Sequence, residues 1–237
     1  TKSNNLTGNL TPGGTFIWKL TVSNAANAKT ATFTNTQTVL TDDLPSGPTY
    51  GTVTVIPSVT NLNCTINGSN VLICTASGGD VSIPANSSFD ITFNVTPISA
   101  GTLTNPVSLC KVDPNNNIPE TDDLNNTCGP NTVTVDKATP IVTTDIHNAS
   151  HAIVSTVLTG ESVHDSARVS SVASPFTASS GTLDFTFYST SDCTGIGTAS
   201  GTVTLSSGVA HPSNTRGPLI GGSYSFKAHY NGDSNYV

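Results

Sequence analysis

The chain has 237 residues, which is enough for two domains of ordinary size. Charged residues make up only 10% of it, and the net charge of −7 argues against nucleic acid as a partner. Hydrophobic residues make up 35%, but no apolar run approaches the roughly 20 residues that a membrane-spanning helix needs. This balance favours β-rich extracellular modules over a disordered chain. The chain contains no methionine, so we expect a processed form or a fragment.

The clearest predicted strand is Thr15–Asn24, with the sequence TFIWKLTVSN. Phe16, Trp18, Leu20 and Val22 alternate with more polar residues, so one face of the strand meets a core and the other meets water. Because the only tryptophan lies on the apolar face, we expect this to be a central strand of a β-sandwich.

Further strands are predicted along the first half of the chain, after a lead-in over residues 1–14 that holds at most a short edge strand. A dense turn cluster, TDDLPSGP, separates the first of these strands from the second. Alternation or β-branched content places these strands at Ala31–Leu40, Tyr50–Ile56, Ser87–Val95, Gly101–Cys110 and Asn131–Val135.

The segment NCTINGSNVLIC predicts a hairpin closed by a disulfide. Folding it symmetrically about Ser69 places Cys64 opposite Cys74, so the hairpin itself brings the two thiols together. Cys110 and Cys128 bracket a long loop of turn-forming residues, and we expect them to form a second disulfide. Disulfides indicate an oxidising compartment, and the chain has no CxxC pair that would favour metal binding instead.

The loop between Cys110 and Cys128 holds the densest set of oxygen ligands. An Asp-x-Asn-x-Asn pattern is how calcium loops begin, but Ile118 stands where a calcium loop needs glycine. An Asn-rich turn closed by the disulfide explains the same residues without an ion, and calcium is the alternative; otherwise we expect no cofactor. The candidate calcium ligands are Asp113, Asn115, Asn117, Glu120 and Asp122.

The first half resembles a known family. TPGGTFIWKLTVSNAANA, TVLTDDLPSGPTYGTVTV, the Cys64–Cys74 hairpin, DITFNVTP and GTLTNPVSL are similar in kind and order to the DUF11-type Ig-like repeat. VDPNNNIPETDDLNN resembles the closing loop of the related CARDB-type adhesion domain. The resemblance covers most of residues 10–136 and implies an Ig-like sandwich from a bacterial or archaeal surface protein.

A boundary is expected near Asp136–Thr139, where a strand leads into a short linker that Pro140 stiffens. This gives two domains, residues 1–136 and 137–237. Strands of the second domain are predicted at Ile141–Ile146, Ala152–Leu158, Ser162–Ser171, Leu183–Tyr188, Gly201–Leu205 and Gly222–Tyr230.

The second half resembles another Ig-like repeat of bacterial surface proteins, through motifs such as VTTDIHNASHAIV, GTLDFTFYSTSDCTG and GSYSFKAHYNGDSNY. That resemblance implies a further strand and a cysteine after NGDSNY. We therefore expect the second sandwich to lack its last strand. Cys193 is then left to pair with a downstream cysteine or with another copy, and a free thiol is the third alternative.

All five histidines lie in the second half, at His147, His151, His164, His211 and His229. A metal site needs three or four of them to converge, and His147 and His151 flank a turn that would bring them close. No acidic or thiol partner has ligand-like spacing, so we interpret them as ordinary surface or sheet histidines. His164, Asp165 and Ser166 have the letters of a hydrolase triad, but neighbouring strand residues face opposite ways, so we expect no enzyme activity.

Eight Asn-x-Ser/Thr sequons mark candidate glycosylation sites, subject to the organism's machinery. They begin at Asn5, Asn9, Asn63, Asn67, Asn86, Asn94, Asn125 and Asn148.

Together these observations predict an all-β chain of two tandem Ig-like antiparallel sandwiches, secreted or attached to a cell surface. The expected function is non-enzymatic and structural: a stalk, an adhesin repeat or a filament subunit that assembles by strand addition to copies of itself or neighbouring repeats. The alternatives are a module that binds a surface glycan or protein, and an accessory domain of a larger secreted enzyme.

Overall fold

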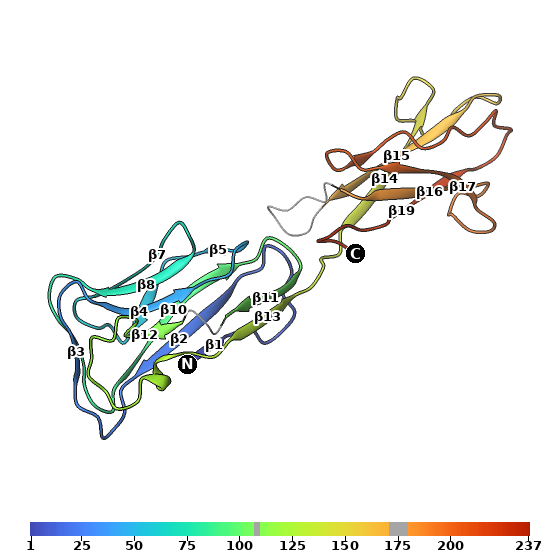
Figure 1. Ribbon diagram of the computed structural model, residues 1–237. Coiled ribbons are helices and arrows are strands. Elements are labelled where there is room, and N and C mark those ends of the chain that lie inside the picture. Colours follow the sequence, from blue (N-terminus) through green and yellow to red (C-terminus); the bar gives the residue numbers. More distant parts are fainter. Residues whose placement is uncertain (107–109, 171–179) are drawn as a thin grey trace. The chain divides into compact units, whose positions relative to one another are not determined.

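The computed structural model describes residues 1–106, 110–170 and 180–237. The chain divides into two compact units, Thr1–Asp136 and Lys137–Val237. The sequence analysis expected the boundary near the same residues. In each unit antiparallel sheets face each other across an apolar core, so the fold is all-β and built of Ig-like sandwiches (Figure 1).

The first unit contains two main sheets and two separate strand pairs. One sheet has the order β1-β2-β10-β5, with β6 also pairing β10; the other has the order β12-β4-β8-β7. The strands of the first sheet are β1 (Lys2–Asn4), β2 (Phe16–Ser23), β10 (Ser88–Thr96), β5 (Thr49–Tyr50) and β6 (Thr54–Ile56). Those of the second are β12 (Lys111–Val112), β4 (Thr38–Asp43), β8 (Val71–Ala76) and β7 (Leu62–Ile66). The pairs are β3 (Ala31–Phe33) with β9 (Val81–Ile83), and β11 (Gly101–Asn105) with β13 (Asn131–Val135).

Strand β2 is central, as its alternation predicted. It pairs with β1 on one side and with β10 on the other, and its inward residues are buried in strict alternation. Trp18 is fully buried and packs edge-on against Phe16 and Phe93, while its indole nitrogen donates to Asn131 Oδ1 at 2.8 Å. The buried indole therefore has the hydrogen-bond partner that burial of its polar atom requires.

Two predicted strands of the first unit are each divided in two. Ala31–Leu40 becomes β3 and β4, which lie in different sheets, because the chain turns at Thr36 with a positive φ of 79°. The other, Tyr50–Ile56, becomes β5 and β6, both paired with β10. Strand β4 also extends to Asp43, into residues that were predicted as a turn, because Asp42 is buried and its strand pairs with β8.

Both predicted disulfides are present. The hairpin of β7 and β8 pairs Cys64 with Cys74 and Ile66 with Leu72, in the register that the sequence predicted. Cys110 and Cys128 close the long loop, which contains the short 3₁₀ helix η1 (Asp123–Asn126). The predicted strand Gly101–Cys110 is confirmed as β11 up to Asn105, and its positions 107–109 lie outside the described residues.

The second unit consists of two three-stranded sheets, β14-β15-β18 and β17-β16-β19. Their strands are β14 (Ile141–Asn148), β15 (Val163–Ser170), β18 (Val209–Ala210), β17 (Thr198–Thr204), β16 (Thr182–Tyr188) and β19 (Ser225–Tyr230). The sequence missed β18, and Ser171, the end of one predicted strand, lies outside the described residues. The predicted strand Ala152–Leu158 is wrong: this segment forms one isolated bridge, Ile153 with His147, and otherwise runs as loop.

The core of the second unit is divided into two clusters. The larger contains Ala167, Leu183, Phe185 and Tyr230, and the smaller contains Val163, Leu219 and Phe226. Strand β15 contributes to both, with Val163 in one and Ala167 in the other. Between them on the same inward face lies Asp165.

The connection between the units is short. The amide of Asp136 donates to the Leu10 carbonyl within the first unit, and the amide of Ala138 donates to the Asn235 carbonyl within the second. Lys137 is the single residue between these two anchors. In the part of the chain that the structure describes, no helix has the length and apolar character that crossing a membrane requires.

Candidate functional site

Four of the five histidines converge at the surface of the second unit, and we call them the histidine cluster: His147, His151, His164 and His211. His147 on β14 and His164 on β15 are directly opposite each other in the strand register, so their side chains share a face of the sheet. His211 follows directly after β18, which pairs with the other edge of β15. Strands β14 and β15 and the residue after β18 therefore each contribute one histidine to the outward face.

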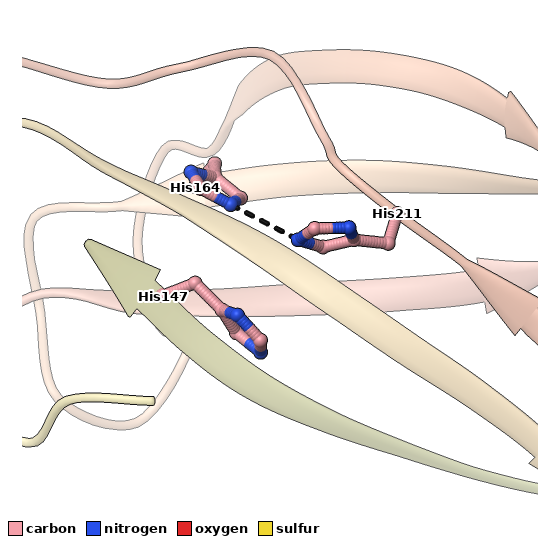
Figure 2. A group of neighbouring side chains, drawn as sticks. All are labelled: His147, His164 and His211. Atoms are coloured by element: carbon pink, nitrogen blue, oxygen red, sulfur yellow. Dashed lines mark hydrogen bonds between the residues drawn. The ribbon is translucent and has the colours of Figure 1, made fainter. Parts of the chain in front are cut away.

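The ring nitrogens of the cluster lie in direct contact. His151 Nδ1 is 3.0 Å from His164 Nε2 and 3.3 Å from His211 Nε2, and the latter two atoms are 3.1 Å apart. One ring nitrogen each of His147, His164 and His211 lie within 4.8 Å of one another. Figure 2 shows the His164 and His211 rings facing each other through ring nitrogens, with the His147 ring beside them.

A tight turn after β14 positions the fourth histidine, His151. Asn148 Oδ1 accepts hydrogen bonds from the amides of Ser150 and Ala152, and the Asn148 carbonyl accepts from the amide of His151. His151 itself adopts a positive φ of 60°, which folds its side chain back over the sheet. The turn is thus built by hydrogen bonds that hold His151 against the other rings.

The same turn sets the tautomer of His147. His147 Nδ1 lies 2.9 Å from the backbone carbonyl oxygen of His151. A carbonyl oxygen only accepts, so Nδ1 must carry the hydrogen, which leaves the lone pair of this ring on Nε2.

The pKa values of two members are lowered. Burial lowers the pKa of His164, and the neighbouring rings of His211, His151 and His147 lower it further. Burial also lowers the pKa of His211, and His147 and His151 add to that effect. The lowered pKa favours the neutral form of both imidazoles, and a neutral imidazole has one ring nitrogen with a lone pair.

Asp165 is the second unusual group of this unit. It follows His164 on β15 but points the opposite way, into the core, and it is fully buried. Among the described residues, neither carboxylate oxygen has a hydrogen-bond partner. Burial raises the pKa of Asp165 to about 7. His164, Asp165 and Ser166 thus face alternate sides of the sheet, as the alternation predicted.

The convergence of the histidines was not predicted. The i, i+4 spacing of His147 and His151 across a turn was the one visible signal. The pairing of His147 with His164 depends on a register that a 14-residue connection does not fix, and His211 arrives on β18, which the sequence missed. The remaining histidine, His229, is exposed on β19, in the other sheet.

In the loop that suggested calcium, the candidate ligand atoms already accept hydrogen bonds. Asp113 is buried, and its two oxygens accept from the amides of Asn117 and Ile118. Glu120 accepts from Asn126, and Asp122 accepts from the amide of Leu124 as the cap of η1. Asn115 is exposed. These bonds account for the loop as a hydrogen-bonded turn, and calcium binding there stays a prediction.

Except for Asn148, which builds the turn at His151, the remaining predicted positions lie apart from the histidine cluster in sequence. Cys193 is a free, half-buried thiol whose sulfur donates to the Phe226 carbonyl at 3.3 Å. Asn148 is half-buried. The other seven sequon asparagines are exposed: Asn5, Asn9, Asn63, Asn67, Asn86, Asn94 and Asn125.

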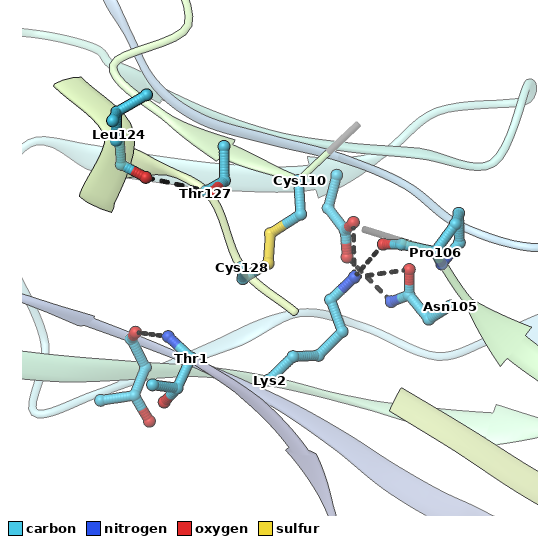
Figure 3. Close-up of a disulfide and its surroundings, with 10 residues drawn as sticks. Thr1, Lys2, Asn105, Pro106, Cys110, Leu124, Thr127 and Cys128 are labelled. Carbon is cyan, nitrogen blue, oxygen red and sulfur yellow. Dashed lines mark hydrogen bonds and ion pairs between the residues drawn. A yellow bond between two sulfur atoms is a disulfide. The ribbon is translucent and has the colours of Figure 1, made fainter. Parts of the chain in front are cut away.

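Sequence reasoning also missed a buried ion pair in the first unit. Lys2 Nζ lies 2.9 Å from Asp42 Oδ1, and both side chains are fully buried. The same ammonium donates to Asn105 Oδ1 and the Pro106 carbonyl, and Asn105 donates to the second oxygen of Asp42 (Figure 3). The Cys110–Cys128 disulfide lies beside this group, and its oxidised sulfurs are not metal ligands.

Comparisons with known proteins give no family assignment. No protein-family model matches the chain, and no curated protein matches it. One solved chain, named BspA_C_WT, is similar with 12% sequence identity and a TM-score of 0.30. The alignment covers 76% of this chain and 61% of that one, so this chain spans about three fifths of its length. The Ig-like sandwich rests on the sheets and cores of the structure itself, while the narrower DUF11-type resemblance has no matching family model behind it.

Proposed function

We propose that this chain is a non-enzymatic structural segment of a secreted or cell-surface protein, in which two sandwiches in series act as a stalk or adhesin repeat. The observation that carries the proposal is the connection between the units. Asp136 and Ala138 are each hydrogen-bonded into their own unit, so one residue, Lys137, remains as a linker. Lys137 itself donates through Nζ to the Asp233 carbonyl of the second unit. A one-residue connection suits modules that transmit force along a chain better than modules that move freely.

The chemistry of the surface and the cysteines supports an extracellular setting. Both disulfides belong to the first unit, and disulfides persist in oxidising compartments. Seven sequon asparagines are exposed, so their side chains are accessible to modification where the organism has the machinery. The DUF11-type resemblance of the first half points to the same class of protein.

The proposal is tested on the source cells and on the isolated chain. Antibodies raised against the folded chain should label intact cells or recover the protein from the culture medium. Pulling single molecules from both ends should give two separate unfolding events, one for each sandwich. Labelling confined to the cell interior would contradict the proposal.

Assembly by strand addition is the filament form of this proposal. Among the described residues, β19 has one ladder partner, β16, so its other edge offers backbone groups that another strand could pair with. Light scattering of the purified chain at high concentration tests this directly. We expect the wild type to form oligomers as its concentration rises, and Ala228→Pro on β19 to stay monomeric. A wild type that stays monomeric at all concentrations would contradict assembly by this route.

A binding module for a surface glycan or protein, or an accessory domain of a secreted enzyme, remains the alternative function. Specific signals for the isolated chain on a glycan array would favour the binding module.

A further inference from the structure

We propose that His147, His151, His164 and His211 bind one divalent transition-metal ion, and that Zn²⁺ is the ion that their geometry fits. The histidine cluster is the one place in the described residues where four side chains of a metal-binding type converge.

Hydrogen bonds alone cannot give each of the three ring nitrogens a suitable partner. Each ring nitrogen carries either a hydrogen or a lone pair, in the plane of its ring. His151 Nδ1, His164 Nε2 and His211 Nε2 all touch one another at 3.0–3.3 Å. Three such atoms can form one well-directed N–H···N bond at most, and the third atom is left facing a like group. A cation bound by the three atoms uses every lone pair at once.

The spacing of these atoms indicates the kind of ion. Zn–N bonds of about 2.0–2.1 Å in a tetrahedron place neighbouring nitrogens about 3.3 Å apart. The three distances of 3.0, 3.1 and 3.3 Å are nearly equal, as on one face of a tetrahedron. A square-planar Cu²⁺ site would instead require one pair of the three to lie opposite each other, about 4 Å apart. The cluster therefore fits Zn²⁺ better than Cu²⁺.

His147 supplies the fourth ligand in the form that metal sites use. Its Nδ1 donates to the His151 carbonyl, so the lone pair is on Nε2, and a metal-binding histidine usually donates its other nitrogen in this way. A ring nitrogen of His147 lies within 4.8 Å of those of His164 and His211. A side-chain rotation that brings it into the first coordination shell completes four imidazole ligands.

The consequence of binding is a cross-link within the second unit. The ion would join β14, β15, the end of β18 and the turn at His151. Residues 137–237 contain one cysteine, Cys193, so no disulfide joins two of these residues. A site closed by four protein ligands is typical of structural zinc rather than of catalytic zinc, which keeps an open position.

The test is metal binding by the tag-free full chain after removal of metal with a chelator. Calorimetric titration at pH 7.5 measures the number of Zn²⁺ ions bound and their affinity for four proteins: the wild type, His211→Gln, His151→Asn and the control His229→Gln. The control removes the one histidine outside the cluster. His151 lies on an exposed turn, and asparagine tolerates the positive φ of this position, so we expect His151→Asn to fold. This variant therefore still tests the proposal if His211→Gln does not fold.

We expect one Zn²⁺ per chain for the wild type and for His229→Gln, with equal affinity. His211→Gln should weaken binding about 100-fold or more, and His151→Asn about 10-fold or more, since even outer-shell changes cost 10–100-fold. Co²⁺ in place of Zn²⁺ should give the strong visible absorption of a tetrahedral site.

Three results would overturn the proposal: no binding by the wild type at submillimolar Zn²⁺, equal weakening by His229→Gln and His211→Gln, or the weak Co²⁺ absorption of an octahedral site. Wild-type affinity in His151→Asn would overturn the four-histidine site. The structural function proposed above does not depend on any of these outcomes.

Discussion

Each unit of this protein has an aspartate with no exposed surface, Asp42 in the first and Asp165 in the second, and the two carboxylates differ in their hydrogen bonds. Asp42 accepts from Lys2 and from Asn105, so both of its oxygens have partners. Asp165 has no hydrogen-bond partner for either oxygen among the described residues. Burial pushes the pKa of both carboxyls up, but at Asp42 the attraction of Lys2 opposes that shift. A buried carboxylate can thus have all of its hydrogen bonds or none, depending on which polar groups surround it.

The same contrast extends to how each unit is held together. The first unit has one continuous core, with Trp18, Phe16 and Phe93 in contact, and two disulfides. The second unit has a core in two clusters and, among its described residues, no disulfide, and it carries the histidine cluster on its outward face. We infer that the two units rely on different cross-links: covalent bonds in the first and a metal ion in the second.

The largest expected effect comes from breaking the buried ion pair. Lys2→Met keeps the aliphatic stem but leaves Asp42 charged, buried and without its cation, and we expect it to destabilise the first unit by about 3–5 kcal/mol. Lys19→Met is the matched control, because the side chains of the Lys19–Asp90 pair, 3.2 Å apart, are 45% and 32% exposed. That variant should change stability by about 1 kcal/mol or less. Denaturant unfolding of both variants measures the difference, and equal effects would contradict the contrast.

Reduction of the disulfides should affect one unit. Each of Cys64–Cys74 and Cys110–Cys128 is expected to contribute about 2–4 kcal/mol by restricting the unfolded chain. A reducing agent should therefore lower the unfolding midpoint of the first unit and leave that of the second unchanged. Thermal scans with and without the reductant check this, and a shift of the second unit would show that Cys193 forms a disulfide with a cysteine outside residues 137–237.

Replacing Asp165 should stabilise the second unit, and the effect should depend on pH. The folded-state pKa of about 7 lies above the value near 3.9 for an unfolded aspartate. The contribution of the protonated carboxyl to stability is therefore complete below about pH 4 and is lost as the pH rises through 7. Asp165→Asn does not titrate, so we expect its free energy of unfolding to exceed that of the wild type by about 4 kcal/mol at pH 8 and by about 1–2 kcal/mol at pH 5.

Chemical unfolding of the metal-free protein at both pH values measures this effect. The control is Asp145→Asn, which removes an exposed charge on the neighbouring strand β14 and should give a much smaller change. A destabilised Asp165→Asn at pH 8 would mean that the carboxylate has a partner in solution.

The smallest expected effect is that of calcium on the first unit. The oxygens of Asp113, Glu120 and Asp122 already accept hydrogen bonds, so millimolar calcium should leave the thermal midpoint of this unit unchanged. A rise in that midpoint that disappears in Asp122→Asn would restore the calcium site.

Local patterns predicted the fold well, and long-range pairing limited what they could predict about the site. The alternation around Trp18 and the symmetry around Ser69 both act over a few residues, and both were confirmed. The ion pair joins Lys2 to Asp42 across 40 positions, and the cluster joins His151 to His211 across 60. No local pattern specifies such contacts, because they depend on which strands become neighbours and in what register. Because Ala152–Leu158 was predicted as a strand, the turn that brings His151 to the cluster was not recognised.

A calorimetric scan of the metal-free full chain, repeated with increasing Zn²⁺, tests the central claim most directly. The two units have separate cores, so two transitions are expected, and reductant sensitivity identifies the first. We predict that Zn²⁺ raises the midpoint of the reductant-insensitive transition, with a stabilisation of about 2.7 kcal/mol at 100 times the dissociation constant. The other transition should not move. If Zn²⁺ moves neither transition, or moves both equally, the second unit is not held together by a metal ion.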